Sequence, residues 1–548
     1  MTSRMYVRLL CVTCILVYFL AQANAIVSSH NCLNVTAKWK NEPNLNDVST
    51  IFVPDNYTTI QAAIYAAEAG DTIRVRNGTY YENIQVNQTV KLIGEDLPTI
   101  CGDSVGMWGA PTADIRVENV TICGFIIRHY YKINERDRGI SLGNRCNITG
   151  NIVCHNIRGV YAGSYNVIRR NLVEDNGVGL TIDGISDTIA DNIIIANGDG
   201  TEIHGTHILL NNTIANNTEF GLQFSAWNSM LRNNTMTGNG YNFMMWESIL
   251  SQQINDIDTS NTVNGKPIYY WINQSEKTVP SDAGYIAIIN STNITVDSLN
   301  LEQNGQGVLI SYSSNITVKN CNLTNNWFGV RIGYSNNVNL HHNNFINNFY
   351  QGETIGTYSW DNGYPSGGNY WNDYNGTDLS SGMYQNETGS DGITDAAYLI
   401  DVNNQDNYPL AAPISIFDVG NWNGTDYNVH VSSNSTVSSF SLNETEKAIR
   451  FNVTSENGLG FCRVTIPNII VQDLWQDNYT VLVDNQPPLE TRNWTDLENT
   501  YLYFTYQYSQ HEVTIIPENP SIILLIASLT LAAATATLLK RKKRSLSA

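Results

Sequence analysis

One Asp–His pair in the middle of the chain has the residue types and the spacing for acid–base chemistry. Asp183 and His204 are 21 residues apart, and Glu202 lies two residues before His204. If the chain coils with that period, the two side chains lie on adjacent coils about 4.8 Å apart. A carboxylate beside an imidazole suits general acid–base catalysis, although such a pair at a coil corner more often makes only a surface hydrogen bond. Asp183, Glu202 and His204 are therefore the candidate catalytic residues.

Two other groups of side chains have the chemistry to hold metal ions. Closely spaced carboxylates around a Gly suit a hard cation such as Ca²⁺, and the candidates are Asp391, Asp395, Asp401 and Asp406. The alternative is that these carboxylates cap turns that close the fold. Copper would need clustered His, Met or Cys, whereas the sequence offers only the scattered pairs His204/His207, His341–His342 and Met244–Met245.

Aromatic side chains form a further set of candidate binding residues. Aromatic rings on an open face can stack on sugar rings, and the same rings can instead cover the edges of a fold. The candidates for ligand binding are Tyr269, Tyr270, Trp271, Trp360, Tyr370 and Trp371. Both uses stay open from the sequence.

A repeat positions these residues. Pairs of Asn five residues apart recur at intervals of 20 to 22 residues. The first members are Asn151, Asn171, Asn192, Asn212 and Asn234, and the second members are Asn156, Asn176, Asn197, Asn217 and Asn239. A period of about 21 residues is the mark of a solenoid.

The runs between the Asn residues predict strands. Segments such as 178–182 and 193–195 are rich in β-branched residues and too short for helices. About 21 residues with three short strands predict a right-handed parallel β-helix over residues 51–350. Asn tolerates left-handed backbone angles, and its amide can bond to the equivalent Asn of the next coil. Residues 60–69 predict a helix that caps the N-terminal end of the core.

Two further units follow the repeat. Residues 351–413 are rich in Gly, Asp, Tyr and Trp, and we expect a C-terminal cap or linker there. Residues 414–517 contain β-rich runs separated by turn residues, which predicts a β-sandwich that serves as a stalk. The fold class is therefore all-β.

Both ends of the chain resemble processing and anchoring signals. Residues 1–25 have the basic, apolar and small-residue regions of a signal peptide, and residues 26–50 form a lead segment. Residues 520–540 are long and apolar enough for one C-terminal transmembrane helix, and residues 541–548 form a basic tail that should stay cytoplasmic. We therefore expect a single-pass cell-membrane protein whose bulk is extracellular.

The amino-acid composition narrows the classes of molecule that we expect the protein to bind. The chain of 548 residues carries a formal charge of −20, yet only 15% of its residues are charged, against about 25% in ordinary soluble domains. An acidic surface poor in Lys and Arg makes nucleic acid an unexpected partner. The exported part contains sequons, and the glycosylation candidates are Asn34, Asn77, Asn119, Asn375, Asn423, Asn452, Asn478 and Asn493.

Cysteine spacing leaves disulfides open. Seven of the nine Cys remain after the signal peptide. Cys101 and Cys123 lie about one coil apart, as do Cys123 and Cys146. A disulfide between coils and buried stacking of the thiols are both compatible with this spacing.

Several motifs together resemble a known family. They are TIQAAIYAAEAGDTIRVRNGTYYENIQVNQTVKLIGE, the Asn coils, NGKPIYYW at 264–271 and GGNYWNDY at 367–374. The chain resembles, over roughly residues 50–413, the NosD-type or CASH-type parallel β-helix proteins with a pectin-lyase-like fold, particularly their archaeal membrane-anchored versions. The resemblance implies carbohydrate binding or processing, or copper delivery.

The residues favour binding over cleavage. Glu174 stands three residues after its ladder Asn, where the following coils carry Ile195, Ala215 and Thr237. Glycoside hydrolysis needs two carboxylates that face one groove, and this position offers no acidic column. We expect a carbohydrate-binding or structural and adhesive surface protein that contacts polysaccharides or surface glycoproteins. The alternatives are a polysaccharide lyase or glycoside hydrolase, and a copper-binding protein. Calcium is an open alternative as a cofactor, and copper rests on family analogy alone.

Overall fold

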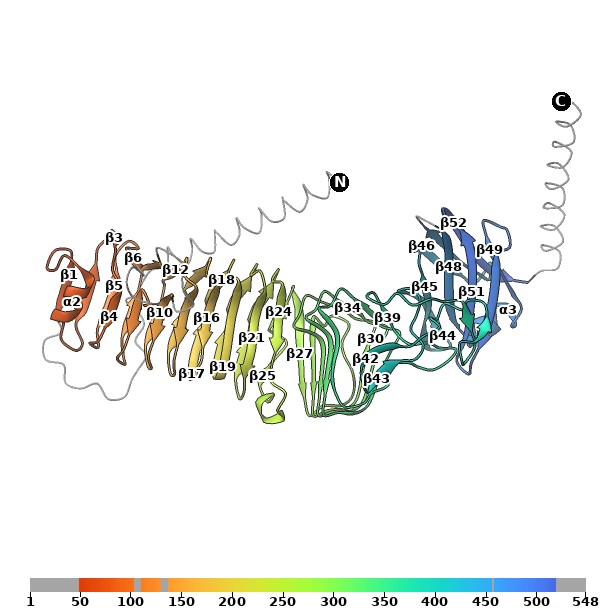
Figure 1. Ribbon diagram of the computed structural model, residues 1–548, viewed down its shortest axis with the longest axis horizontal. Coiled ribbons are helices and arrows are strands. Elements are labelled where there is room, and N and C mark those ends of the chain that lie inside the picture. Colours follow the sequence, from red (N-terminus) through yellow and green to blue (C-terminus); the bar gives the residue numbers. More distant parts are fainter. Residues whose placement is uncertain (1–48, 103–109, 130–136, 456–457, 519–548) are drawn as a thin grey trace, which may run out of the picture.

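The computed structural model describes residues 49–102, 110–129, 137–455 and 458–518. The predicted signal peptide, nearly all of the lead segment with Asn34, the predicted transmembrane helix and the basic tail lie outside the described residues. Within the described ranges, no helix has the length and apolar character needed to cross a bilayer. Figure 1 shows a row of coils capped by a helix at one end and followed by two antiparallel sheets at the other.

A short helix covers the N-terminal end of the coils, as predicted. Helix α2 (Ile60–Ala66) begins after Thr59, whose hydroxyl accepts the N–H of Ala62. The carboxylate of Glu82 accepts the next two free N–H groups, those of Ile60 and Gln61, at 2.9 Å each. The helix is three residues shorter than the predicted 60–69 segment. Its buried residues, Ile60, Ala63 and Ile64, seal the open end of the core.

The first part of the solenoid, which we call the N-terminal stack, has three parallel faces. Face A contains β1 (Thr50–Val53), β2 (Thr72–Val75), β5 (Lys91–Gly94), β8 (Thr121–Cys123), β11 (Asn147–Thr149), β14 (Val167–Arg169), β17 (Ile185–Ala190), the second half of β19 (Asp199–Leu210), β22 (Met230–Arg232) and β25 (Asp256–Ile257). Face B contains β3 (Thr79–Tyr80), β6 (Thr99–Gly102), β9 (Ile126–His129), β12 (Ile152–Cys154), β15 (Leu172–Glu174), β18 (Ile193–Ile195), β20 (Thr213–Ala215), β23 (Thr235–Thr237) and β26 (Thr262–Val263). Face C contains β4 (Ile84–Val86), β7 (Ala113–Ile115), β10 (Arg138–Leu142), β13 (Arg158–Ala162), β16 (Val178–Ile182), the first half of β19, β21 (Phe220–Ala226) and β24 (Tyr241–Met245).

The predicted Asn ladders are confirmed at two corners of this stack. Asn171 donates from Nδ2 to Oδ1 of Asn192 at 3.0 Å, and Asn192 donates in the same way to Asn212 at 3.0 Å. All ten predicted ladder residues are at most 3% exposed. The first ladder continues to Asn261, which accepts from Asn234 at 2.8 Å. Each ladder amide thus satisfies buried groups of the coils on both sides.

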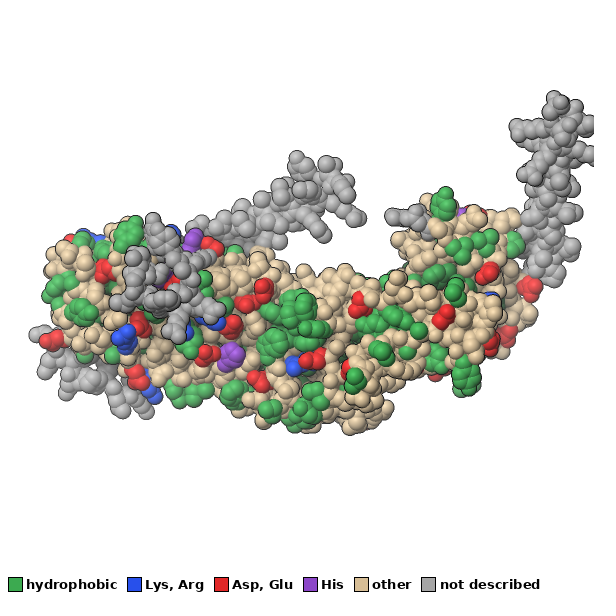
Figure 2. All heavy atoms as spheres, in the orientation of Figure 1, with side chains coloured by type: hydrophobic (Ala, Val, Ile, Leu, Met, Phe, Trp, Pro, Cys, Tyr) green, Lys and Arg blue, Asp and Glu red, His purple; other side chains and the backbone are tan. Residues whose placement is uncertain are grey.

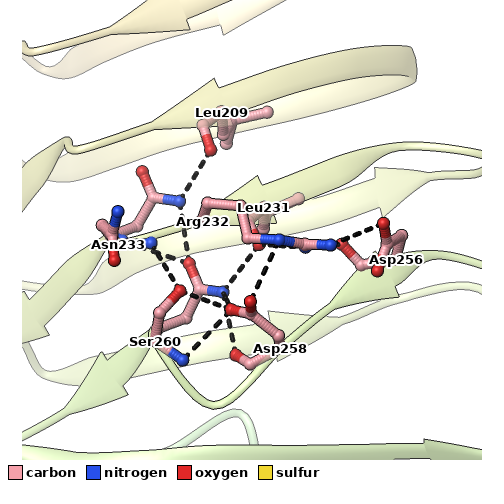
Figure 3. Close-up of polar contacts among 9 residues, drawn as sticks. Leu209, Leu231, Arg232, Asn233, Asp256, Asp258 and Ser260 are labelled. Atoms are coloured by element: carbon pink, nitrogen blue, oxygen red, sulfur yellow. Dashed lines mark hydrogen bonds and ion pairs between the residues drawn. The ribbon is translucent and has the colours of Figure 1, made fainter.

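Figure 3 shows how the end of the first ladder is fixed. Arg232 forms ion pairs with Asp256 at 2.6 Å and with Asp258 at 3.0 Å. Asp258 also accepts the N–H of Ser260 at 3.1 Å, and its carbonyl accepts from the amide of Asn261 at 3.0 Å. The cluster therefore holds the turn that carries the last ladder Asn.

One reason given for Asn at the corners is wrong. The left-handed backbone angles fall on the residue before each ladder Asn, for example Arg170, Asp191 and Asn211, with φ between 53° and 56°. The ladder Asn is selected by its amide bonds and not by its φ. A Gly column completes the corner, because a Cβ at Gly179 would lie 2.5 Å from the carbonyl oxygen of Gly200 in the next coil.

The coils do not run uninterrupted from 51 to 350, since residues 246–284 form a junction. This segment holds a 3-10 turn, η2 (Leu250–Gln252), and β27 (Lys266–Ile272), which pairs antiparallel with β26 and parallel with β29. The core divides at the same place into two clusters of buried side chains. The order of the strands around the coil therefore shifts in residues 246–284, where the hairpin of β26 and β27 interrupts the parallel pairing.

The second part of the solenoid, the C-terminal stack, again has three faces and extends past residue 350. Face D contains β27, β29 (Tyr285–Ile289), β32 (Gln306–Ser311), β35 (Phe328–Gly333) and β38 (Tyr350–Ile355). Face E contains β28 (Ser275–Thr278), β30 (Thr292–Asp297), β33 (Ser314–Lys319) and β36 (Asn336–His341), and face F contains β31 (Asn300–Glu302), β34 (Asn322–Thr324), β37 (Asn344–Ile346) and β39 (Tyr370–Trp371).

An aromatic plug closes the C-terminal stack. Trp371 stacks between Phe345 and Tyr398, with ring centroids 4.2 and 4.3 Å away. The buried carboxylate of Asp406 accepts the indole N–H of Trp371 at 3.0 Å and the N–H of Asn369 at 2.7 Å. The rest of this cap consists of two small hairpins, β40 (Ser380–Ser381) with β41 (Glu387–Thr388), and β42 (Tyr398–Asp401) with β43 (Asn404–Asp406).

Residues 414–517 form a two-sheet domain. One sheet contains β44 (Ile414–Trp422), β45 (Thr425–Ser433), β48 (Leu459–Pro467), β51 (Asn499–Gln507) and β50 (Glu490–Thr495). The other contains β46 (Thr436–Asn443), β47 (Ala448–Thr454), β52 (Gln510–Pro517) and β49 (Tyr479–Val483). The two sheets share one core, which also buries the unpredicted helix α3 (Asn468–Trp475). Arg463 of β48 is 2% exposed and donates to the carbonyls of Pro365 and Asp391, so the domain is bonded to the cap.

Candidate functional site

The predicted Asp–His pair lies at the edge of a polar hollow on the outward side of face C. The hollow has a volume of about 450 Å³. Its lining residues come from β10, β13, β16 and β19 and from the turn after β16, and they are Arg138, Arg158, Tyr161, Thr181, Asp183, Glu202 and His204. We call this set the polar hollow. The structure therefore brings the three candidate catalytic residues together in one place.

Parallel pairing explains how residues far apart in sequence meet there. Arg138 pairs in register with Arg158, and Tyr161 pairs with Thr181, which pairs with Glu202. Because adjacent coils are about 4.8 Å apart, each register row presents its side chains in a line. The hollow is thus built from outward-facing residues of successive coils.

Hydrogen bonds hold most of the hollow in place. Arg158 donates to Glu202 and to the Thr181 hydroxyl, at 2.6 Å each. The Tyr161 hydroxyl donates to Asp183, and this bond raises the pKa of Tyr161. The guanidinium of Arg138 lies over the Tyr161 ring, 3.7 Å from its centroid. The two carboxylates and the two guanidinium groups of the hollow balance one another in formal charge.

The predicted contact of Asp183 with His204 is long. Nε2 of His204 lies 3.9 Å from Oδ1 of Asp183, and the side chains are 50% and 42% exposed. Both groups therefore keep free sites for hydrogen bonds to a ligand. A catalytic role for Asp183 and His204 stays a hypothesis.

Sequence reasoning missed four of the lining residues, although a signal for them exists. Arg138 and Arg158 are 20 residues apart, as are Tyr161 and Thr181. A column of acidic residues alone does not reveal these four, because the hollow combines carboxylates and guanidinium groups with hydroxyl groups. An alignment of the outward positions in the 20-residue frame would have found them.

A group of aromatic residues continues the same surface beyond the hollow. Phe220 follows Asp199 on face C and pairs in register with Tyr241, and Phe328 pairs with Tyr350 on face D. The ring centroid of Trp327 lies 5.4 Å from that of Phe220 and 4.2 Å from that of Phe349. We call the set the aromatic platform; its members are Phe220, Tyr241, Trp246, Trp327, Phe328, Phe349 and Tyr350.

The outer rings of this platform are open to solvent. Phe349 is 58% exposed and Tyr350 is 50% exposed. Figure 2 shows hydrophobic side chains gathered at mid-length of the β-helix, with acidic and histidine side chains near them. The indole N–H of Trp246 bonds to Gln223, which pairs in register with Glu202, so platform and hollow adjoin. None of these rings was among the aromatic residues selected from the sequence.

The aromatic residues that were selected lie elsewhere and are mostly buried. Tyr270, Trp360 and Trp371 are 7%, 1% and 1% exposed, so their rings pack in the core and have no face open to a ligand. Tyr370 is half-buried beside β37. Tyr269 and Trp271 are half-buried at the junction, where Tyr269 bonds to Asp282 at 2.8 Å.

The four carboxylates considered for calcium serve four separate turns. Asp391 accepts the N–H of Ile393, Asp395 accepts that of Ser380, Asp401 accepts that of Asn403 and Asp406 accepts that of Tyr408. Burial raises the pKa of Asp406 to about 7. In the described part of the chain no group of three or more His, Cys, Asp and Glu side chains has an arrangement that could hold a metal. The turn-capping alternative describes these residues.

Copper donors are also dispersed. Met244 and Met245 are fully buried, and the His207 ring is enclosed beside Asp187. His341 and His342 lie near His430 of the two-sheet domain, with ring centroids 4.8 and 6.0 Å apart along the row. Burial lowers the pKa of His342 to about 4. These side chains do not have the arrangement of a copper site.

The structure also places the cysteines and the glycosylation candidates of the described residues. Cys146 is a buried free thiol that donates to the carbonyl of Asn144, which excludes its disulfide with Cys123. Burial raises its pKa. Among the glycosylation candidates in the described residues, Asn452 on β47 is half-buried. The other described candidates are exposed, and they are Asn77, Asn119, Asn375, Asn423, Asn478 and Asn493.

Comparisons with solved structures find similar solenoids at low sequence identity. The Dettilon tailspike protein is 11% identical, with 85% of this chain and 93% of that chain covered at a TM-score of 0.35. The A-module of a mannuronan C-5 epimerase from Azotobacter vinelandii is 18% identical, with 53% and 73% covered at 0.23. PfbA, a surface adhesin of Streptococcus pneumoniae, is 13% identical, with 55% and 89% covered at 0.27.

Family models match the solenoid itself. No curated protein matches the chain. Residues 249–370 match the model described as "Right handed beta helix region", and residues 67–279 match the model described as "Periplasmic copper-binding protein (NosD)". Over residues 67–370 the chain is therefore a right-handed parallel β-helix, as in the pectin-lyase-like fold, and over residues 67–279 it is similar to the NosD family.

Proposed function

We propose that the chain is a polysaccharide-binding surface protein and that one long outward surface, made of the polar hollow and the aromatic platform, is the binding site. The observation that carries this proposal is that the two lie on adjoining coils. A sugar chain presents hydroxyl groups at its edges and apolar C–H faces, and this surface offers partners for both.

The polar hollow supplies fixed hydrogen-bonding groups. Glu202 and Asp183 are acceptors held by Arg158 and Tyr161. Groups already held in place lose little conformational entropy when a ligand binds. Because the charges in the hollow balance, it suits neutral sugars better than a polymer with a carboxylate on every unit.

The aromatic platform supplies the apolar contact. Phe349 and Tyr350 expose half or more of their surface while Trp327 and Phe328 support them from below. Aromatic rings with one free face give large contact area and lose little flexibility. A ligand that reaches both parts must span several coils, which requires an oligosaccharide or a polymer.

The placement of the protein is part of the proposal. The apolar segment 520–540 with its basic tail would anchor the chain in the cell membrane after removal of residues 1–25, with the bulk of the chain outside. The two-sheet domain would act as a β-sandwich stalk between that anchor and the β-helix. Labelling of intact cells with a membrane-impermeant reagent would modify the β-helix if this is correct.

Affinity electrophoresis of the purified protein tests the binding. Native gels that contain one neutral or acidic polysaccharide each should retard the protein for at least one neutral polymer. Glu202→Gln and Phe349→Ala should each weaken the retardation, whereas Glu95→Gln, which removes a surface ion pair away from the hollow, should not. If none of the polysaccharides retards the protein, the proposal is wrong.

The same polymers decide between binding and cleavage. We expect no new reducing ends and no unsaturated uronates after incubation with the protein. Cleavage that disappears in Asp183→Asn or His204→Gln would instead establish the lyase or hydrolase alternative at the same hollow.

A further inference from the structure

A second Asp–His pair lies beneath the polar hollow and is fully enclosed. Nδ1 of His207 lies 3.2 Å from Oδ2 of Asp187, and both side chains are 0% exposed. The pair bridges the same two coils as Asp183 and His204. Nothing about the exposed pair requires a buried pair behind it, so the buried pair needs its own explanation.

The corner in which this pair sits is elsewhere filled by neutral side chains. Cys146 donates its N–H to Asn166 at 2.9 Å, and three coils after Asn166 the N–H of Ser229 is donated to Asn255 at 3.0 Å. The C-terminal stack fills the equivalent corner with Ser291, Ser313 and Ser335, again with each side chain accepting an N–H. Neutral Asn and Ser therefore satisfy this corner, whereas burial of an Asp beside a His carries a desolvation cost and is weak evidence for stability.

The chain path is different only at this coil among the neighbouring coils that the structure describes. In the coils on both sides, the strands of faces C and A are separate elements, such as β16 and β17, or β21 and β22. Strand β19 instead runs through the corner without a break and bends at Gly205, where φ is 110°. A Cβ at Gly205 would lie 1.9 Å from the carbonyl oxygen of Gly184, so the two coils are pressed together there.

The His207 ring ties this bend to the hollow. Its Nε2 lies 2.7 Å from the carbonyl oxygen of His204, so Nε2 carries a hydrogen and donates it to that carbonyl. Its Nδ1 faces Asp187, and Asp187 accepts the N–H of Asn166 from the preceding coil at 2.6 Å. The orientation of the ring thus fixes the backbone of His204 relative to the coil that carries Asp183.

We propose that Asp187 and His207 are positioning residues of the polar hollow, which hold the Gly205 bend so that His204 stands beside Asp183. The inference rests on the proposed function for its purpose but not for its geometry. The pair contacts no ligand itself. It acts through the peptide of His204 and the turn after Asp183.

The double variant Asp187→Asn/His207→Asn converts the corner to the Asn type found in the neighbouring coils. We expect its thermal unfolding midpoint to stay close to that of the unchanged protein. In its crystal structure the 3.9 Å approach of His204 to Asp183 should be lost, and retardation by the binding polymer should weaken about tenfold in apparent affinity, which corresponds to about 1.4 kcal/mol. Ser313→Ala, at the same corner of the C-terminal stack, is the matched control and should alter neither the hollow nor the retardation.

Each outcome decides the inference. A double variant that folds and keeps both the approach of His204 to Asp183 and the full affinity would overturn it. If the double variant does not fold, Asp187→Asn alone keeps the oxygen that accepts from Asn166 and is judged by the same crystal structure. If the unchanged protein binds no polymer, the proposed function fails, while the geometry of the hollow in the variant still tests the positioning role.

Discussion

The N-terminal and C-terminal stacks of the β-helix share one coil plan but fill their corners differently. In the N-terminal stack the corner between faces A and B is an unbroken column from Asn151 to Asn261. The equivalent corner of the C-terminal stack carries Leu299 and Cys321 before it returns to Asn343 and Asn369. An apolar residue or a thiol can thus replace the amide where the neighbouring coil still provides an acceptor.

The comparison separates what folds the solenoid from what it can bind. Corners tolerate several residue types, and the buried pair Asp187–His207 lies next to His204 of the polar hollow. The outward rows also change, from Arg and Glu on face C to Phe and Tyr on faces C and D at the aromatic platform. Departures from the repeat therefore mark the surface that we propose as the binding site.

The largest effect is expected at the closed end of the C-terminal stack. Trp371→Ala removes a fully buried ring that stacks on two others and leaves the Asp406 carboxylate without its indole donor. Loss of a large core aromatic costs about 3–5 kcal/mol of unfolding free energy. Urea unfolding followed by tryptophan fluorescence would measure it. Phe349→Ala on the exposed platform is the control, and an equal loss in both variants would contradict the assignment of buried and exposed rings.

The next largest effect on stability is expected in the Asn ladders. Asn192→Ala removes the acceptor of two donors of Asn171 and the donor to Ile168, all of them buried. Each unsatisfied buried group costs about 1–3 kcal/mol, so we expect about 3 kcal/mol in all. Cys321→Ala, at the same corner of the other stack, should cost about 1 kcal/mol. Equal losses in the two unfolding curves would show that the corners of the two stacks do not differ as described.

Acid should loosen the joint between the C-terminal stack and the two-sheet domain. Burial lowers the pKa of His342 to about 4 and that of His430 to about 3. Because the unfolded imidazoles bind protons near pH 6.5 and the folded ones do not, their contribution is complete above pH 6.5 and is lost as the pH falls towards 4. We expect the free energy of unfolding to fall steadily as the pH drops from 7 to 4.5. His342→Asn/His430→Asn should flatten the pH dependence of the unfolding midpoint, and an unchanged slope would refute this origin.

The smallest effect on stability is expected in the polar hollow. Glu202→Gln removes the charge that pairs with Arg158 at side-chain exposures of 22% and 30%, and such a pair contributes about 1 kcal/mol or less. The same change should weaken polysaccharide retardation about tenfold. A variant that lost stability but kept its affinity would show that Glu202 supports the fold and not the binding.

The sequence predicted most of the fold because every coil needs the same residue types at the same positions. The spacing of Asn171, Asn192 and Asn212 sets the coil length, and the ladder bonds are those expected. The change of phase at the junction 246–284 was not predicted, since its hairpin breaks the period and Tyr270 and Tyr285 become core residues there. Periodicity has no signal for a change of phase.

The candidate site was predicted in part for a related reason. Asp183 and His204 were found because both lie at one register position, while Arg138 and Tyr161 were missed because mixed columns were not considered. The platform depends on Phe220 and Trp327, which are 107 residues apart and meet only through the junction. The burial of Trp360 and Trp371 likewise depends on the cap, whose path the repeat does not determine.

The central claim is that a polysaccharide lies along the polar hollow and the aromatic platform. Hydrogen exchange measured by mass spectrometry, with and without the polymer that retards the protein, tests it most directly. We expect protection on β13, β16, the first half of β19, β21, β24, β35 and β38, with none on the strands of faces A and E. Protection confined to other faces or to the two-sheet domain would contradict the account.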